Sequence, residues 1–105
     1  MVKHVKGKEL EELIKTSELP VVCDFWANWC GPCRMLAPVF EAIADKYADK
    51  AEFVKINVDE EDQAAMKYRI SSIPNIIAFK NGEAKGNNLG FVPAEALESF
   101  VKQYL

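Results

Sequence analysis

The order of hydrophobic and polar positions along the chain predicts strands and helices that alternate. The run Pro20–Ala27 is mostly apolar and barely alternates, which is typical of a strand buried on both faces of a sheet. Residues 32–48 repeat apolar side chains at helical spacing and predict the longest helix. Similar signals predict further strands over 2–6, 53–58, 76–79 and 84–90, and further helices over 8–16, over 60–68 and from Pro93 through Tyr104.

This order predicts an α/β fold with a central mixed five-stranded sheet, flanked by four helices on its two faces. Helical crossovers should make the first strands parallel. Asn81-Gly82 is a strong hairpin signal, so the last two strands should form an antiparallel edge.

Three details of the helices are also predicted. Asp59 is the expected N-cap of the helix over 60–68. Pro38 lies inside the helix over 32–48 and should kink it, because proline lacks a backbone donor. The inward side of that helix should carry Met35, Leu36, Val39, Phe40, Ile43 and Tyr47.

Composition and charge narrow the class of protein. The chain has 105 residues, enough for a single domain with its own core, so residues 1–105 are expected to form one domain. The net charge of −3 and the lack of a basic cluster argue against a nucleic-acid partner. No apolar run approaches the roughly 18 residues of a membrane helix, and the start of the chain lacks the apolar region of a signal peptide. With only three cysteines, a cytoplasmic location is expected, where thiols stay reduced unless they are catalytic.

The stretch Trp29-Cys30-Gly31-Pro32-Cys33 places two thiols one helical turn apart, between a predicted strand and a predicted helix. Backbone N–H groups and the positive end of the helix dipole favour a thiolate at the first position. Cys30 is therefore the expected nucleophile, which forms a mixed disulfide with a substrate. Cys33 should then resolve that intermediate.

Other interpretations of the two cysteines are weaker. Structural zinc needs four ligands, and only Cys23 and His4 remain, without zinc-site spacing. A structural disulfide across so short a loop would constrain the unfolded chain little. A chance pair of reduced cysteines is the third alternative. Because strand, cysteine pair and helix follow in the order that a redox site requires, dithiol–disulfide exchange is favoured.

Asp24 is unusual because its carboxylate lies within an apolar strand, where an unpaired charge is costly. Burial should raise its pKa, which suits a group that exchanges protons near neutral pH, so Asp24 is the candidate base for Cys33. The alternative is a structural carboxylate, either at a sheet edge or paired with Lys55 on the next strand. Cys23, its neighbour, should point to the opposite face as an inert apolar side chain. No function is assigned to His4.

The chain resembles thioredoxins over essentially its full length. The most specific match is Asp24-Phe25-Trp26-Ala27-x-Trp29-Cys30-Gly31-Pro32-Cys33-Arg34-Met35, and the confirmatory ones are Ile73-Pro74, Phe79-Lys80-Asn81-Gly82-Glu83 and Gly90. The continuation Ala37-Pro38 is more similar to the bacterial members.

The resemblance implies the thioredoxin fold, the same roles for Cys30 and Cys33, and a lysine, Lys55, beside a buried catalytic Asp24. It also implies a cis peptide between Ile73 and Pro74 that faces the dithiol. The substrate-docking surface that it implies consists of Trp29, Gly31, Pro32, Ile73, Pro74, Gly90 and Phe91. Asn75, Ser71-Ser72 and the bulky Phe91 depart from the usual family pattern and bear on partner preference.

The expected function is therefore a general protein-disulfide reductase and dithiol electron carrier that acts on oxidised proteins as a monomer. The resemblance implies recharging by a flavin-containing, NADPH-dependent thioredoxin reductase, and no bound cofactor or metal besides the redox-active Cys30–Cys33 disulfide. Pro32 disfavours an oxidant or isomerase, whose relatives usually carry histidine there, and the motif lacks the Pro-Tyr of glutaredoxins. A binding module in which redox chemistry is incidental remains an alternative.

Overall fold

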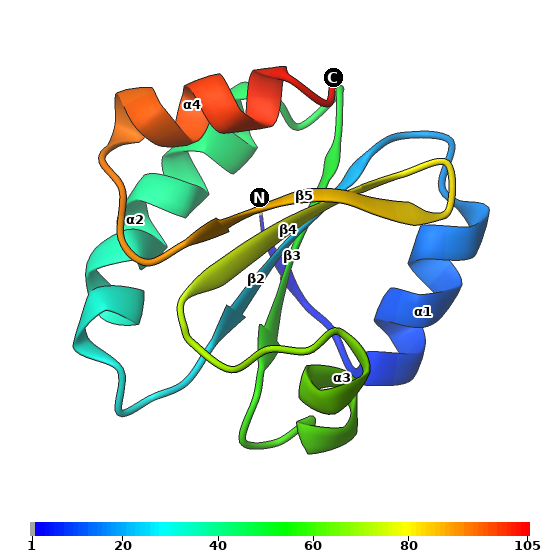
Figure 1. Ribbon diagram of the computed structural model, residues 1–105. Helices are drawn as coiled ribbons and strands as arrows, with labels where there is room; N and C mark the ends of the chain where they lie inside the picture. Colours follow the sequence, from blue (N-terminus) through cyan, green and yellow to red (C-terminus); the bar gives the residue numbers. More distant parts are fainter. Residues whose placement is uncertain (1) are drawn as a thin grey trace.

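A five-stranded mixed sheet forms the centre of the computed structural model, which describes residues 2–105 (Figure 1). Its strands are β1 (Lys3–His4), β2 (Val21–Trp26), β3 (Glu52–Asn57), β4 (Asn75–Lys80) and β5 (Glu83–Leu89). They lie in the order β1-β3-β2-β4-β5. The β1–β3 and β2–β3 pairs are parallel, whereas the β2–β4 and β4–β5 pairs are antiparallel. This confirms the mixed sheet and its antiparallel edge.

Four helices cover the two faces of the sheet (Figure 1). They are α1 (Gly7–Thr16), α2 (Gly31–Lys46), α3 (Asp62–Lys67) and α4 (Ala94–Lys102). Helices α2 and α4 pack together on one face, where Lys46 Nζ lies 2.6 Å from Glu98 Oε2, and α1 and α3 lie on the other face. The predicted α/β class and order of elements are therefore confirmed.

Strand β2 separates two hydrophobic clusters because its side chains alternate between the faces. Val22 packs on the α2 side, together with Leu36 and Phe40. Val21, Cys23 and Phe25 pack on the α1 side, in a cluster that includes Leu10 and Ala64. A strand buried on both faces is what the apolar run Pro20–Ala27 predicted.

The predicted hairpin is present between β4 and β5. Asn81 and Gly82 have positive φ angles of 54° and 81°. Both angles match the type of two-residue turn whose twist fits a pair of antiparallel strands, and they explain the Asn-Gly sequence.

Some sequence predictions were wrong. Strand β1 has two residues instead of the five over 2–6, since the chain turns into α1 at Gly7. Asp59 is not the N-cap of α3, which begins later, at Asp62, after Glu61. Pro93 is the N-cap of α4 and not its first helical residue.

Met35 does not lie on the inward side of α2. Its side chain is 60% exposed, while Leu36, Phe40 and Ile43 are buried. The buried residues follow a spacing of three to four, and Met35 lies one residue away from this stripe, on the solvent side. The helix continues through Pro38 as far as Lys46, and the expected kink stays a prediction.

Candidate active site

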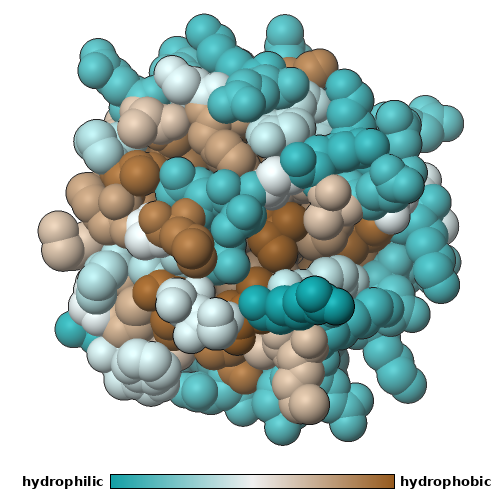
Figure 2. Space-filling view, viewed as in Figure 1, coloured by the Kyte–Doolittle hydropathy of each residue, from teal (hydrophilic) through white to brown (hydrophobic). Residues whose placement is uncertain are grey.

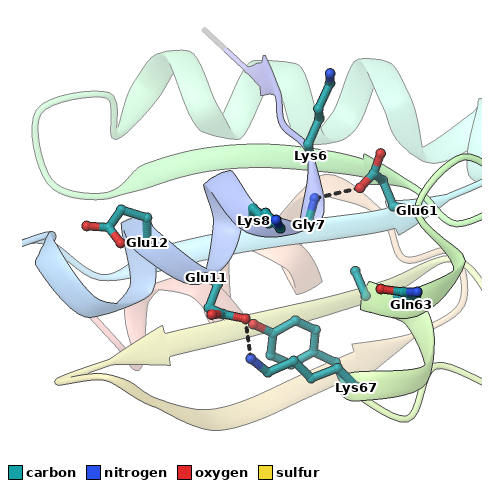
Figure 3. Close-up of a pocket in the computed structure, with 10 residues that line it drawn as sticks. Lys6, Gly7, Lys8, Glu11, Glu12, Glu61, Gln63 and Lys67 are labelled. Atoms are coloured by element: carbon teal, nitrogen blue, oxygen red, sulfur yellow. Dashed lines mark hydrogen bonds and ion pairs between the residues drawn. The ribbon is translucent and has the colours of Figure 1, made fainter.

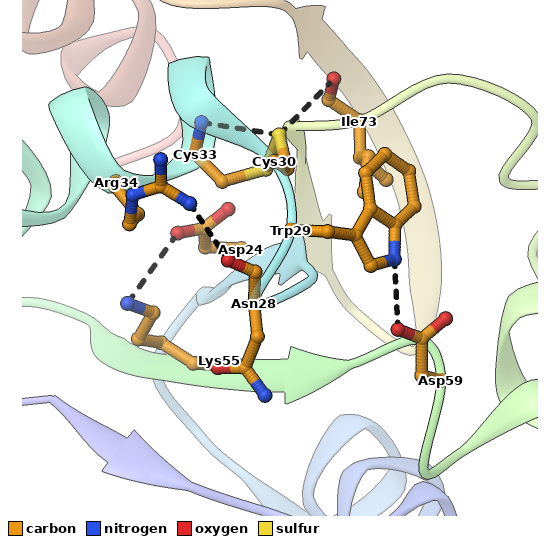
Figure 4. Close-up of a disulfide and its surroundings, with 9 residues drawn as sticks. All are labelled: Asp24, Asn28, Trp29, Cys30, Cys33, Arg34, Lys55, Asp59 and Ile73. Atoms are coloured by element: carbon orange, nitrogen blue, oxygen red, sulfur yellow. Dashed lines mark hydrogen bonds and ion pairs between the residues drawn. A yellow bond between two sulfur atoms is a disulfide. The ribbon is translucent and has the colours of Figure 1, made fainter.

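Cys30 and Cys33 form a disulfide at the N-terminus of α2, with their Cα atoms 5.2 Å apart (Figure 4). Cys30 is the N-cap residue, and its Sγ accepts a hydrogen bond from the backbone N–H of Cys33 at 3.2 Å. The sulfur thus takes the place of the oxygen that usually caps a helix. After reduction, the same N–H group and the helix dipole would stabilise a Cys30 thiolate.

The loop before β4 lies against this disulfide. The Ile73 carbonyl oxygen is 3.9 Å from Cys30 Sγ, and the Ile73–Pro74 peptide bond is cis, as the resemblance implied. The Gly90 N–H donates to the Pro74 carbonyl at 2.8 Å, which ties the segment after β5 to this loop. Gly90 has a φ of +81°, a conformation that glycine adopts without strain.

The side chains expected to form the docking surface differ in exposure. Trp29 is 69% exposed and Phe91 is 39% exposed, whereas Cys30 is only 5% exposed. Pro32 is exposed as well, while Gly31, Ile73 and Gly90 are half-buried and Pro74 is buried. On the face viewed in Figure 2, apolar side chains gather in patches bordered by hydrophilic ones.

Trp29 is held by Asp59, since its indole N–H donates to Asp59 Oδ2 at 2.9 Å (Figure 4). Asp59 lies just beyond β3, so this contact joins the redox motif to the neighbouring strand end. On the other side of the motif, Arg34 Nη1 donates to the Asn28 carbonyl at 2.8 Å. These two contacts hold the adjacent residues Asn28 and Trp29 in the loop between β2 and α2.

Asp24 is fully buried in β2, directly opposite Lys55 of β3 in the parallel register. Its Oδ2 lies 4.0 Å from Lys55 Nζ, and neither carboxylate oxygen has a hydrogen-bond partner. Burial raises the pKa of Asp24 to about 6, and the nearby Lys55 charge lowers it in part. A carboxylate with such a pKa can accept and release a proton near neutral pH. The structure thus places Lys55 beside the buried Asp24 carboxylate, while the role of Asp24 as a base stays a prediction.

The third cysteine lies on the opposite face of β2. Cys23 is a free, buried thiol in the cluster on the α1 side. Burial raises its pKa well above the ordinary value, with a smaller contribution from the Asp24 charge. A thiol that stays protonated and buried is a poor nucleophile, which agrees with the inert role expected from sequence.

A groove on another part of the surface is remote from this chemistry. A groove of about 640 Å³ lies between α1 and α3, and neither Asp24 nor either cysteine of the disulfide lines it (Figure 3). It is lined mainly by charged side chains, of which Lys67 and Glu11 form an ion pair. Glu61 Oε1 accepts a 2.7 Å hydrogen bond from the Gly7 N–H in the same groove. The groove therefore lies at the junction of α1 and α3 and contains none of the residues of the redox motif.

Within residues 2–105, no three His, Cys, Asp or Glu side chains are grouped so that they could hold a metal ion. None of the helices described in this part of the chain has the length and apolar character needed to cross a bilayer.

Sequence reasoning missed several neighbours of the disulfide. Asp59 was interpreted as a helix cap, and no signal in the sequence pairs it with Trp29 across 30 residues. The sequence assigns no function to His4 and gives Trp26 no contact with the disulfide. Yet the Trp26 ring packs against the disulfide cluster and lies near both His4 and Lys55.

Comparisons with known proteins match nearly the whole chain. The thioredoxin family model matches residues 1–103. The chain is 45% identical to a thioredoxin of Bacillus subtilis (strain 168) over 101 residues, which are 96% of this chain and 97% of that protein. It is 46% identical to an M-type chloroplastic thioredoxin of Pisum sativum over 104 residues, which are 99% of this chain and 60% of that protein. The chain spans between 54% and 60% of the length of three such chloroplastic relatives.

Proposed function

The chain belongs to the thioredoxin family, and on this premise we propose that it is a protein-disulfide reductase and dithiol electron carrier. The observation that carries the proposal is the position of Cys30, whose sulfur caps α2 and accepts the Cys33 N–H at 3.2 Å. This environment favours the attacking thiolate, and the partner thiol lies one turn away, ready to resolve the product.

The reaction begins with the reduced protein. The Cys30 thiolate attacks one sulfur of a substrate disulfide, and a Cys30–substrate mixed disulfide forms while the other substrate sulfur leaves as a thiolate and takes up a proton. The Cys33 thiol then loses its proton and attacks Cys30 Sγ. The second substrate thiolate leaves, and the Cys30–Cys33 disulfide seen in the structure is formed. Two electrons pass from the protein to the substrate.

Asp24 is the proposed acceptor of the Cys33 proton. It lies on the face of β2 that α2 covers, and its pKa of about 6 leaves it ionised but basic at neutral pH. In the view of Figure 4 its carboxylate is drawn between the disulfide and Lys55. The Lys55 ammonium keeps the carboxylate ionised for the next cycle.

The proposed docking surface consists of Trp29, Gly31, Pro32, Ile73, Pro74, Gly90 and Phe91. Apolar side chains next to an accessible backbone suit extended segments of many oxidised proteins. Recharging by a flavin- and NADPH-dependent thioredoxin reductase belongs to the same proposal. The monomeric state, the cytoplasmic location and the independence from bound cofactors, nucleic acid and membranes stay predictions.

The reduction potential of the Cys30–Cys33 couple tests the proposal. Equilibration against a thiol–disulfide buffer should give a value close to about −270 mV, as for electron donors of this type. A value near about −180 or −120 mV would instead indicate an isomerase or an oxidant. A protein with both cysteines replaced by serine should lose all reductase activity, whereas a pure binding module would keep its function.

A further inference from the structure

Three strands of the sheet bring His4, Lys55 and Asp24 into one row. Lys55 is in register with His4 on β1 and with Asp24 on β2, and both pairs are parallel. Residues in register on neighbouring strands point to the same face of a sheet. The row therefore runs from the exposed sheet edge at His4 to the buried carboxylate, beneath α2.

Trp26 is the neighbour common to this row and the redox pair. It lies two residues after Asp24 on β2, so its side chain is on the same face. The Lys55 Nζ lies over its ring, 4.9 Å from the centroid, and the His4 ring meets it edge-on at 5.9 Å. Trp26 also packs against the cluster of Ala27, Cys30 and Cys33.

The Lys55 ammonium has little else to fix its position next to Asp24. At 4.0 Å from Oδ2 it is beyond hydrogen-bonding distance, and both Asp24 oxygens lack a hydrogen-bond partner. A lysine side chain has four rotatable bonds, and its ordering costs conformational entropy. Attraction between a cation and an indole face is strongest for buried pairs, and Lys55 is only 8% exposed.

We propose that Trp26 is a positioning residue for the exchange reaction: its ring face holds the Lys55 ammonium beside Asp24, and His4 braces the ring edge. The inference rests on the proposed function, in which Asp24 takes the Cys33 proton. It assigns to Trp26 a task other than packing. The negative charge density of the ring face attracts the Lys55 ammonium, and this attraction keeps the ammonium close enough to Asp24 to interact with it.

Other charged and titratable groups face this region. They are His4 from β1, and Cys30 and Cys33 from the start of α2, where the exposed Arg34 is also located. Arg34 donates to the Asn28 carbonyl, and the two cysteines do not titrate while they form the disulfide. In the oxidised protein, the position of the Lys55 charge is therefore expected to set how far the pKa of the Asp24 carboxyl is lowered.

The test is the pKa of the Asp24 carboxyl, measured by carbon NMR in the oxidised protein. Tryptophan analogues that carry increasing numbers of ring fluorines can replace tryptophan. Each added fluorine weakens the negative electrostatic potential of the ring face, with little change of shape. The chain has two tryptophans, so Trp29→Phe leaves Trp26 as the only labelled position. We expect the Asp24 pKa to rise stepwise with fluorination, by about half a unit or more in total, because Lys55 lowers it less when loosely held.

The matched control is the same fluorination series in Lys55→Met. There the Asp24 pKa should start higher and no longer change with ring fluorination, since the cation is absent. A pKa that is unchanged or falls in the first series overturns the proposal, and so does an equal rise in both series. The pKa measurement needs no turnover, so a negative result for Trp26 leaves the reductase assignment intact. A wrong reductase assignment would instead be revealed by the reduction potential of the Cys30–Cys33 couple.

Discussion

The indole N–H of Trp29 donates a 2.9 Å hydrogen bond to Asp59, 30 residues further along the chain. Trp29 is the most exposed large side chain next to Cys30 in the motif, and this bond fixes the orientation of its ring. An oriented aromatic face costs a partner less entropy on docking than a mobile one.

Asp59→Ala should therefore weaken substrate docking without altering the chemistry. We expect KM for a disulfide-bonded protein to rise about two- to fivefold, the effect of one exposed hydrogen bond, with kcat nearly unchanged. Steady-state kinetics with a chemical reductant would measure both constants. Asp59→Asn is the control, because it keeps an acceptor oxygen and removes the charge. If Asn and Ala raised KM equally, the charge and not the hydrogen bond would be responsible.

Asp24 makes stability depend on pH in a direction opposite to that of an ordinary ion pair. Its pKa in the folded protein is raised to about 6 from 3.8, so between these values the folded state binds more protons than the unfolded state. Stability therefore falls as pH rises through this window. The full penalty, on the order of 2–3 kcal/mol, is present above pH 6 and absent below pH 4.

Asp24→Asn should remove this penalty while keeping the shape of the side chain. Urea unfolding at pH 8 should show the variant to be more stable by about 2 kcal/mol, and at pH 4 the gain should vanish. The same variant should resolve mixed disulfides more slowly, because the base is lost. A stability gain of equal size at both pH values would mean that ionisation of Asp24 is not its cause.

The sequence predicted much of the fold because its strongest patterns are local. The apolar run of β2 and the Asn81-Gly82 turn each determine the conformation of their own segment of backbone. The rules for connections between strands then allow only a few strand orders. Met35 shows the limit: helical spacing defines an apolar stripe, but packing against the sheet and α4 decides which of its edge residues are buried.

The chemistry of the site was also partly predictable. Cys30, Cys33 and Asp24 stand out within one short segment, because thiols at a helix start and a carboxylate in an apolar strand are locally unusual. The contacts of Trp26 and Asp59 depend on strands that are distant in sequence, so nothing local reveals them. The cis bond before Pro74 came from the family resemblance, as few bonds before proline are cis.

Gly86 of β5 leaves room for Tyr104, which follows α4. A Cβ at this position would overlap the Tyr104 hydroxyl, and the Tyr104 ring packs edge-on against Phe100 at 5.3 Å. Gly86→Ala should displace the ring and cost about 1–2 kcal/mol of unfolding free energy, measured by urea denaturation. In a Tyr104→Ala background the same change should cost little. Additive losses in the double variant would show that the glycine is needed for another reason.

Replacing the two cysteines of the disulfide one at a time separates attack from resolution. Cys30→Ser should abolish turnover, because the thiol at the helix cap is lost. Cys33→Ser should still attack but should stop at the mixed disulfide, since no thiol one turn away can displace the substrate. Mass spectrometry should then show one substrate chain bound per protein, and only one thiol released.

Cys23→Ala is the matched control for the cysteine variants, because Cys23 is buried on the opposite face of β2 with a strongly raised pKa. Its turnover should equal that of the parent protein, and adding it to Cys33→Ser should leave the trapped complex unchanged. If Cys33→Ser turned over at the parent rate, another group would have to release the substrate. Loss of that turnover on adding Cys23→Ala would identify Cys23 as the resolving thiol. Persistence of the complex in both backgrounds assigns resolution to Cys33 alone.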